Sequence, residues 1–384
     1  MLQETSMKVC LSIMLRRVRT LKITLCLIAL VLLTATAMSQ SKTPPTWQKW
    51  LAAAPPTPDF QPADTLDAWL KQREQVRAKL WDLLGKLPPR PNPVSVCVVS
   101  RTEHADFTLE KLELDNGAGD LVPCYLLLPK NGQEKSPAIL YCHWHGGQYD
   151  VGKEELFGTN ATPVPPGPAL AKLGFAVIAV DACCFGERNG KGPGGPREKG
   201  SAGEMTASKF NLWFGRTLWG MILRDDLIAL DYLRSRPEID GNRIGVTGIS
   251  MGATRTWWLM ALDDRLKVGA AVCCLTRYQN LIASESLREH GIYYFVPGML
   301  NHFDTEAVVA MAAPRPLLFQ SGEKDPGSPV DGIHIIESKV SKLYKLFGAP
   351  DNFQSIIYPN VGHVYTPEMW SKTTNWLTKH LSLR

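Results

Sequence analysis

The sequence has no internal repeat, no CxxC pair and no cluster of Lys and Arg outside its first 39 residues. Without a CxxC pair, nothing indicates a paired-cysteine zinc or redox site. Clustered basic residues mark nucleic-acid-binding domains, so nucleic acid is excluded as an expected partner. What remains is an ordinary globular composition, 45% hydrophobic and 21% charged over 384 residues, which predicts one large domain with additions.

Long apolar runs are also scarce, and the one present lies near the N-terminus. The uncharged segment 23–41 follows a group of basic residues, Arg16, Arg17, Arg19 and Lys22. Its apolar part, 23–33, is followed by small residues and is shorter than the about 20 residues of a membrane span. This order predicts a secretory signal peptide over residues 1–39, and hence a periplasmic or extracellular protein. An uncleaved anchor is the alternative, and membrane contact is expected only in that case.

Removal of this segment changes the charge of the chain. Residues 1–39 hold five basic residues and one acidic residue, so the net charge falls from +5 for the whole chain to about +1. Seven cysteines then remain: Cys97, Cys124, Cys142, Cys183, Cys184, Cys273 and Cys274. Export permits disulfides, but an odd number cannot all pair. Cys142, Cys273 and Cys274 lie in apolar strand-like runs, which favours buried free thiols.

Residues 40–94 differ in composition from the rest. The part 40–63 is rich in proline and predicts an extended lead-in. Apolar residues then recur at helical spacing over 64–87, and Pro88 and Pro89 end the run. We expect an N-terminal helix that packs on the main domain, 95–384.

The main domain begins with three predicted strands, after which strands and helices alternate. This order predicts an α/β fold with a mostly parallel central sheet and helices on both faces. Active sites of such sheets lie beyond the C-terminal ends of the strands. The predicted strands are 94–100, 107–114, 121–128, 137–142, 175–181, 243–247, 268–274, 316–320 and 353–358, and the main predicted helices are 217–235, 331–346 and 367–381.

The segment 189–208 is rich in Gly and Pro and has no apolar periodicity. It therefore predicts a long loop that borders the pocket or lies on the surface. Its glycines do not form a phosphate-binding pattern.

Ser250 lies in the motif Gly248-Ile249-Ser250-Met251-Gly252, which follows the β-rich run 243–247 and precedes a helix-like run. In this context a GxSxG motif predicts a sharp strand-to-helix turn that exposes a nucleophilic serine. A turn this tight leaves room only for glycine two residues to either side. The Met251 N–H then points to the place where an oxyanion would form.

Asp325 and His363 complete the predicted catalytic set. Each follows a predicted strand, and the order Ser, Asp, His is that of α/β-hydrolases. Asp325 would orient the imidazole and His363 would act as general base. Glu323 and Asp331 are the rivals for the acid. For the base, His334 and His380 also follow the acid, but both fall inside predicted helices.

The loop His143-Trp144-His145-Gly146-Gly147 follows the strand 137–142. A second oxyanion donor is expected there, from the backbone N–H of either His145 or Gly146. A metal site at His143 and His145 is a competing interpretation, but two histidines without a clear third ligand are weak evidence for one. We therefore predict no metal and no organic cofactor.

Three stretches resemble a bacterial α/β-hydrolase family related to dienelactone hydrolases, acetyl xylan esterases and the catalytic domain of prolyl oligopeptidases. The stretches are 142–154 with its H-x-H-G-G motif, 240–253 around the serine, and 313–325 before the acid. The resemblance covers roughly residues 95–384. Dienelactone hydrolases use a cysteine nucleophile, which Ser250 replaces here. Prolyl oligopeptidases carry a large propeller, for which fewer than a hundred residues before the domain leave no room.

The resemblance implies an exported serine carboxylesterase that acts through an acyl-enzyme, on a small-molecule or carbohydrate ester such as acetylated xylan. A serine peptidase of the prolyl oligopeptidase type is the nearest alternative. A non-catalytic binding module on the same fold is a third, because fold alone does not fix function. The oligomeric state and the acyl-chain length are not predicted.

Overall fold

A computed structural model describes residues 53–130 and 134–381. The predicted signal segment, 1–39, lies outside the described residues, as does the part of the lead-in up to residue 52. From Thr57 onward the chain forms one compact unit. In the part of the chain that the structure describes, no helix is long and apolar enough to cross a membrane.

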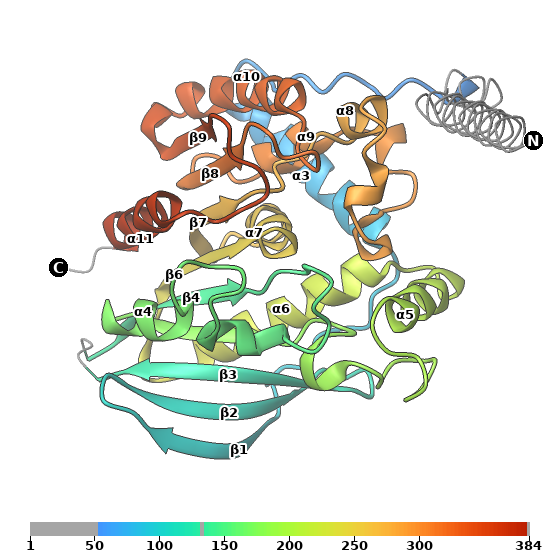
Figure 1. Cartoon of the computed structure of the whole chain (residues 1–384). Helices are drawn as coiled ribbons and strands as arrows, with labels where there is room; N and C mark the ends of the chain where they lie inside the picture. Colours follow the sequence, from blue (N-terminus) through green and yellow to red (C-terminus); the bar gives the residue numbers. More distant parts are fainter. Residues whose placement is uncertain (1–52, 131–133, 382–384) are drawn as a thin grey trace, which may run out of the picture. The chain divides into compact units, whose positions relative to one another are not determined.

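The described residues form one nine-stranded sheet with the order β1-β2-β3-β5-β4-β6-β7-β8-β9 (Figure 1). Strands β1, β2, β3 and β5 pair antiparallel, and all pairs from β5 to β9 are parallel. The predicted mostly parallel sheet is therefore confirmed. The strands are β1 Val96–Glu103, β2 Phe107–Asp115, β3 Leu121–Pro129, β4 Ser136–Cys142, β5 Ala176–Val180, β6 Ile239–Ile249, β7 Leu266–Val272, β8 Leu317–Gly322 and β9 Phe353–Tyr358.

Helices cover both faces of the sheet, as predicted. One face packs against α3 Leu66–Leu84, α6 Leu218–Ser235, α7 Met251–Leu262, α9 Thr305–Ala310 and α10 Val330–Leu346. The other face packs against α4 Pro166–Lys172 and α11 Pro367–Leu381. Among the described residues, two further α-helices, α5 Ser201–Trp213 and α8 Tyr278–Ala283, belong to long connections.

Strand β4 shows why a parallel strand reads as a continuous apolar run. All of its residues are buried. Ala138 and Leu140 contribute to the core on the α6 side, whereas Ile139 and Tyr141 contribute to the core on the α4 side. Because successive side chains point to opposite faces and both faces are covered, no polar alternation is left in the sequence.

The predicted loop 189–208 is wrong in its last part, because helix α5 begins at Ser201. The sequence shows no apolar periodicity for this helix because the residues on its buried face are polar or small, among them Glu204, Ala207 and Ser208. Apolar residues lie on its exposed face instead, and Trp213 is 91% exposed. A helix whose inward face is polar gives no amphipathic signal of the usual sign.

Candidate active site

Ser250 lies at a strained turn between β6 and α7, with φ 59° and ψ −119°. Residues other than glycine rarely adopt a backbone conformation with φ in this left-handed range, and those that do are often found at functional sites. The turn is held against β4. A Cβ atom on Gly248 or Gly252 would lie 2.2 or 2.0 Å from the Cys142 carbonyl oxygen. Only glycine fits at these two positions, which explains the spacing of the motif.

Asp325 and His363 are joined by a hydrogen bond of 2.7 Å between Asp325 Oδ2 and His363 Nδ1. Asp325 is buried, and its other oxygen accepts the Gly327 N–H at 2.9 Å. The loops that carry the two residues touch, since a Cβ atom on Gly322 would lie 2.3 Å from the Gly362 carbonyl oxygen. The His363 imidazole is thus held at one nitrogen, and Nε2 remains for another partner.

Three of the four rival residues form hydrogen bonds or ion pairs elsewhere, and the fourth, His380, packs against Trp376 on its own helix, α11. Glu323 accepts the Asn360 N–H at 2.8 Å, and Asp331 accepts from the Asn280 amide at 2.8 Å. His334 pairs with Glu337 on α10 itself. None of these contacts involves the imidazole of His363.

Ser250, Asp325 and His363 line one pocket of about 280 Å³. It lies beyond the C-terminal ends of β4, β6, β7 and β8, where the fold rule places active sites. Among the described residues that line it, there is no Lys or Arg, and Glu289 adds a carboxylate. The other lining residues are His145, Gly146, Gly147, Cys274, His290, Gly291, Tyr293, Pro326 and Gly327.

The backbone N–H groups of the loop after β4 can be accounted for one by one. Trp144 N–H donates to Glu155 Oε2 at 2.7 Å, Gly147 N–H to His145 Nδ1 at 3.0 Å, and Gln148 N–H to the His145 carbonyl at 2.9 Å. Within the described chain, the N–H groups of His145 and Gly146 have no such acceptor. These two are the donors that remain to face the pocket.

Two buried carboxylates from outside the loop hold it in place. Glu155 accepts both the Trp144 N–H and the Tyr141 hydroxyl, the latter at 2.5 Å. Glu204 of α5 accepts from His145 Nε2 at 3.2 Å. Because Nδ1 of the same ring accepts from Gly147, Glu204 fixes the tautomer that the loop needs. The segment 189–208, predicted to border the pocket or to lie on the surface, therefore contacts a lining residue of the pocket through Glu204.

The competing metal site does not fit this geometry. His143 is fully buried, its Nδ1–H donates to the Trp144 carbonyl at 2.7 Å, and its Nε2 accepts the Ala182 N–H at 3.1 Å. Burial lowers the pKa of His143 well below its ordinary value, so the ring stays neutral. Both nitrogens of His143 and both of His145 are already used, and neither ring has one left for a metal.

Burial raises the pKa of Glu155 from 4.5 to about 7. The native state thus holds this proton more tightly than the unfolded chain does. As pH rises from about 4.5 to 7, the contribution of Glu155 to stability falls, and above 7 it is constant.

We expect Glu155→Gln to remove this loss, because the amide oxygen still accepts the Trp144 N–H while no charge forms. The free energy of unfolding of the variant, relative to that of the wild type, should be higher at pH 8 than at pH 5 by up to roughly 3 kcal/mol. Urea unfolding at both pH values measures this. Glu154→Gln, which removes a half-exposed carboxylate from the same turn, controls for net charge. A gain of the same size at both pH values would contradict the assignment.

Two cysteines at the site were not singled out as site residues from the sequence. Cys273 and Cys274 follow β7 directly, and both have positive φ, 63° and 57°. Cys274 Sγ lies 4.0 Å from Ser250 Oγ, and burial raises its pKa, so it is a neutral thiol beside the serine. Their place at the end of a parallel strand is the signal that could have found them.

The prediction of free thiols is confirmed for Cys142, Cys273 and Cys274, all of which are buried. Tyr293, His290 and Glu204, by contrast, come from connections whose course only the fold sets, and no motif marks them.

A model described as the Abhydrolase family matches residues 43–373. The chain belongs to this family. Membership of this family makes the protein a hydrolase-type enzyme.

Relatives agree with this membership. The Bacillus subtilis protein named "Putative hydrolase YtaP" is 36% identical over 311 residues, which are 80% of this chain and 100% of that protein. A glucuronoyl esterase from Solibacter usitatus has a similar structure, with a TM-score of 0.64 and 18% identity over 85% of this chain and 99% of that one. An acetyl xylan esterase from Thermoanaerobacterium sp. JW/SL YS485 matches with a TM-score of 0.54 and 16% identity over 85% and 96%. At these identities the two structures bear on the fold alone.

Proposed function

We propose that this hydrolase is an exported serine carboxylesterase in which Ser250, Asp325 and His363 form the catalytic triad. The observation that carries the proposal is the shared pocket. A strained, half-buried serine lines the same 280 Å³ space as an imidazole held by a buried carboxylate. An activated nucleophile needs this set of parts, a hydroxyl, a base and a group that orients the base.

In the proposed mechanism, Ser250 Oγ attacks the ester carbonyl carbon while His363 Nε2 takes its proton. Asp325 accepts a hydrogen bond from the Nδ1–H of His363, so this proton stays on Nδ1 and the imidazolium is stabilised. Negative charge on the former carbonyl oxygen is met by the Met251 N–H and by the free N–H of His145 or Gly146. His363 then protonates the leaving alcohol, and the acyl-enzyme forms. Water, deprotonated by His363, repeats the sequence and releases the acid.

The pocket favours a small, uncharged ester. Its volume suits a short acyl group with part of the alcohol. With Glu289 in its lining and no cation among the described lining residues, it would repel an anionic substrate. Acetyl esters of carbohydrates meet both conditions, and the fold is shared with a protein named acetyl xylan esterase. Export rests on the N-terminal segment of the sequence and agrees with such a substrate.

A fluorophosphonate probe tests the proposal directly, because it reacts only with an activated serine. We expect stoichiometric labelling of the wild type, mapped to the peptide that contains Ser250, and loss of p-nitrophenyl acetate hydrolysis in step with it. Ser371→Ala, on the exposed face of α11, is the matched control and should label fully. No label on folded protein would overturn the triad and favour the non-catalytic binding module.

The ester preference needs a second comparison. We expect hydrolysis of p-nitrophenyl acetate to exceed that of longer acyl chains, together with release of acetate from acetylated xylan. Cleavage of peptide amides at comparable rates would instead support the peptidase alternative.

A further inference from the structure

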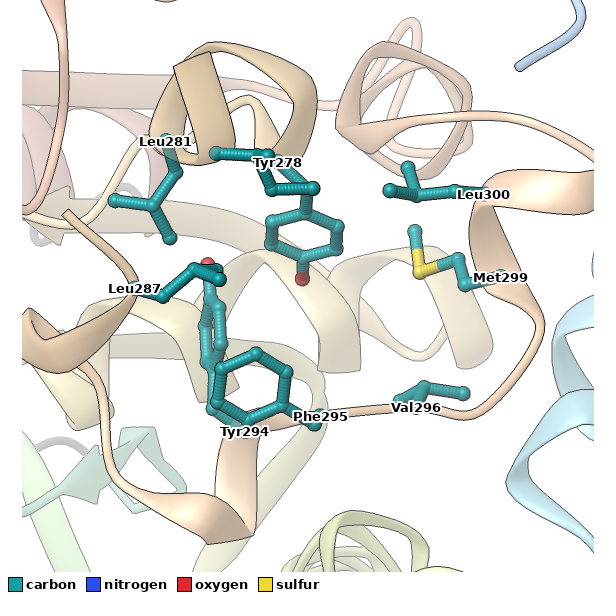
Figure 2. Close-up of a pocket in the computed structure, with 9 residues that line it drawn as sticks. Tyr278, Leu281, Leu287, Tyr294, Phe295, Val296, Met299 and Leu300 are labelled. Atoms are coloured by element: carbon teal, nitrogen blue, oxygen red, sulfur yellow. The ribbon is translucent and has the colours of Figure 1, made fainter. Parts of the chain in front are cut away.

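A second cavity lies on the other side of the segment that walls the catalytic pocket. It occupies about 100 Å³ between α8 and the chain that leads from Leu287 to Leu300 (Figure 2). The wall is shared, since Tyr293 lines the catalytic pocket and Tyr294 lines the second cavity. The rest of the lining is apolar and includes Leu281, Leu287, Val296, Met299 and Leu300.

Two polar groups interrupt this apolar lining. The hydroxyl oxygens of Tyr278 and Tyr294 are buried, and in the described protein neither has a partner at hydrogen-bonding distance and angle, although the two hydroxyls are near enough to perturb each other's pKa. Tyr294 as a whole is only 3% exposed. Figure 2 shows the Tyr278 hydroxyl pointing into the space among the apolar side chains and the Tyr294 hydroxyl directed toward Leu281 and Leu287. Buried hydroxyls without partners are costly, so such groups usually serve a ligand or water.

The chemistry of these groups defines what they can bind. Burial raises the pKa of both tyrosines well above 10, so both hydroxyls keep their protons and can donate. A matching ligand offers an acceptor oxygen and otherwise apolar surface. The cavity is smaller than the about 150 Å³ that accommodates a benzene ring. It therefore suits a short alkyl group with a carbonyl, and the half-exposed Phe295, at 41%, marks its mouth.

The cavity is also linked to the candidate catalytic residues. The ring of Tyr294 stacks on His290, with centroids 4.2 Å apart and planes 10° apart. His290 Nε2–H donates to the Gly327 carbonyl at 3.0 Å, and the Gly327 N–H donates to Asp325 at 2.9 Å. A ligand that accepts a hydrogen bond from the Tyr294 hydroxyl would shift the Tyr294 ring, against which the His290 imidazole is stacked.

From these observations we propose a second binding site for a short-chain neutral carbonyl compound, with its acceptor oxygen on Tyr278 and Tyr294. Occupancy of this site is coupled through His290 to the loop of Asp325. The binding step is independent of the proposed function, whereas the coupling rests on it.

Binding is tested with acetone, which cannot be hydrolysed and is smaller than benzene, on the Ser250→Ala protein by ligand-observed NMR titration. We expect saturable binding that weakens about fivefold or more in the Tyr278→Phe/Tyr294→Phe background. Leu281→Trp, which fills the cavity, should abolish it. Unchanged affinity in the double Phe background would overturn the site and leave ordered water as the partner of the hydroxyls. Since Ser250 is absent, a failed triad proposal does not affect this result.

The thermal midpoint of ligand-free Tyr294→Phe provides a second readout that does not depend on any ligand. If the Tyr294 hydroxyl is unpaired until a ligand binds, its removal should leave the midpoint unchanged or raise it, because the ligand-free protein no longer buries an unsatisfied polar group. A lowered midpoint would mean that the hydroxyl stabilises the fold and would count against the site.

Coupling is tested on the wild-type enzyme with p-nitrophenyl acetate. We expect saturating acetone to change kcat of the wild type, and we expect the kcat of Tyr294→Phe, measured against its own ligand-free value, not to respond. A change in KM alone that persists in Tyr294→Phe would show competition in the catalytic pocket and would overturn the coupling.

Discussion

Ser250→Ala is expected to lower kcat/KM for p-nitrophenyl acetate by roughly 10⁴-fold or more. The alanine cannot form the acyl-enzyme, and the oxyanion donors alone stabilise only a slow attack by water. Because the turn already holds a side chain with φ 59°, alanine adds no atom and should fold as the serine does. Steady-state kinetics, with circular dichroism to confirm folding, measure the effect.

The comparison needs a serine whose loss is neutral. Ser371→Ala provides it, since Ser371 lies exposed on α11 far along the chain from the site. Its kcat/KM should match the wild type. If Ser250→Ala kept more than about a tenth of the wild-type rate, the acyl-enzyme mechanism of serine hydrolases would be excluded.

Asp226→Ala is expected to reduce the free energy of unfolding by about 3–5 kcal/mol. Asp226 on α6 and Arg255 on α7 are fully buried and joined by two hydrogen bonds of 2.5 and 2.9 Å. Removal of the carboxylate leaves the guanidinium charge in the core with only a 3.5 Å contact to the His143 carbonyl. Urea unfolding curves give the difference.

A paired replacement separates loss of charge balance from loss of packing. Asp226→Leu/Arg255→Met removes both charges and should be markedly more stable than Asp226→Ala, because apolar residues of similar size often replace a buried ion pair without cost. Arg255 belongs to the helix that begins at the Ser250 turn, so the single variant should also lose activity at lower urea concentration. A double variant no more stable than the single one would contradict this account.

The elements that formed as expected are those whose signal is local. Residues 367–381 form α11 and residues 353–358 form β9, both with the predicted bounds. The turn at Ser250 was also marked by local sequence, the GxSxG motif between a strand-like and a helix-like run. The structure adds the reason for the two glycines, which is the crowding of Gly248 and Gly252 against Cys142 of β4. Strand β6 begins at Ile239, four residues before its predicted start, because Asp240 to Asn242 extend it without an apolar pattern.

Other parts of the site depend on neighbours that are distant in sequence. Glu204 gave no signal because helix α5 turns its polar side inward, and its importance appears only once His145 lies beside it. The same is true of Glu155, whose carboxylate is buried under the loop after β4. Which N–H groups of this loop stay free also depends on the fold. The Gly147 N–H donates to His145 Nδ1, whereas the N–H groups of the two predicted candidates, His145 and Gly146, have no acceptor in the described protein.

The sequence by itself thus determined the α/β class, the strand-to-helix turn at Ser250 and the residues after each strand end, because these follow from hydrophobic period and glycine sterics within short windows. Only the tertiary structure decided which strand ends meet around one pocket, which N–H groups stay free, and that Tyr293 and Tyr294 face different cavities. Those outcomes depend on packing between segments up to a hundred residues or more apart, and periodicity carries no record of such contacts.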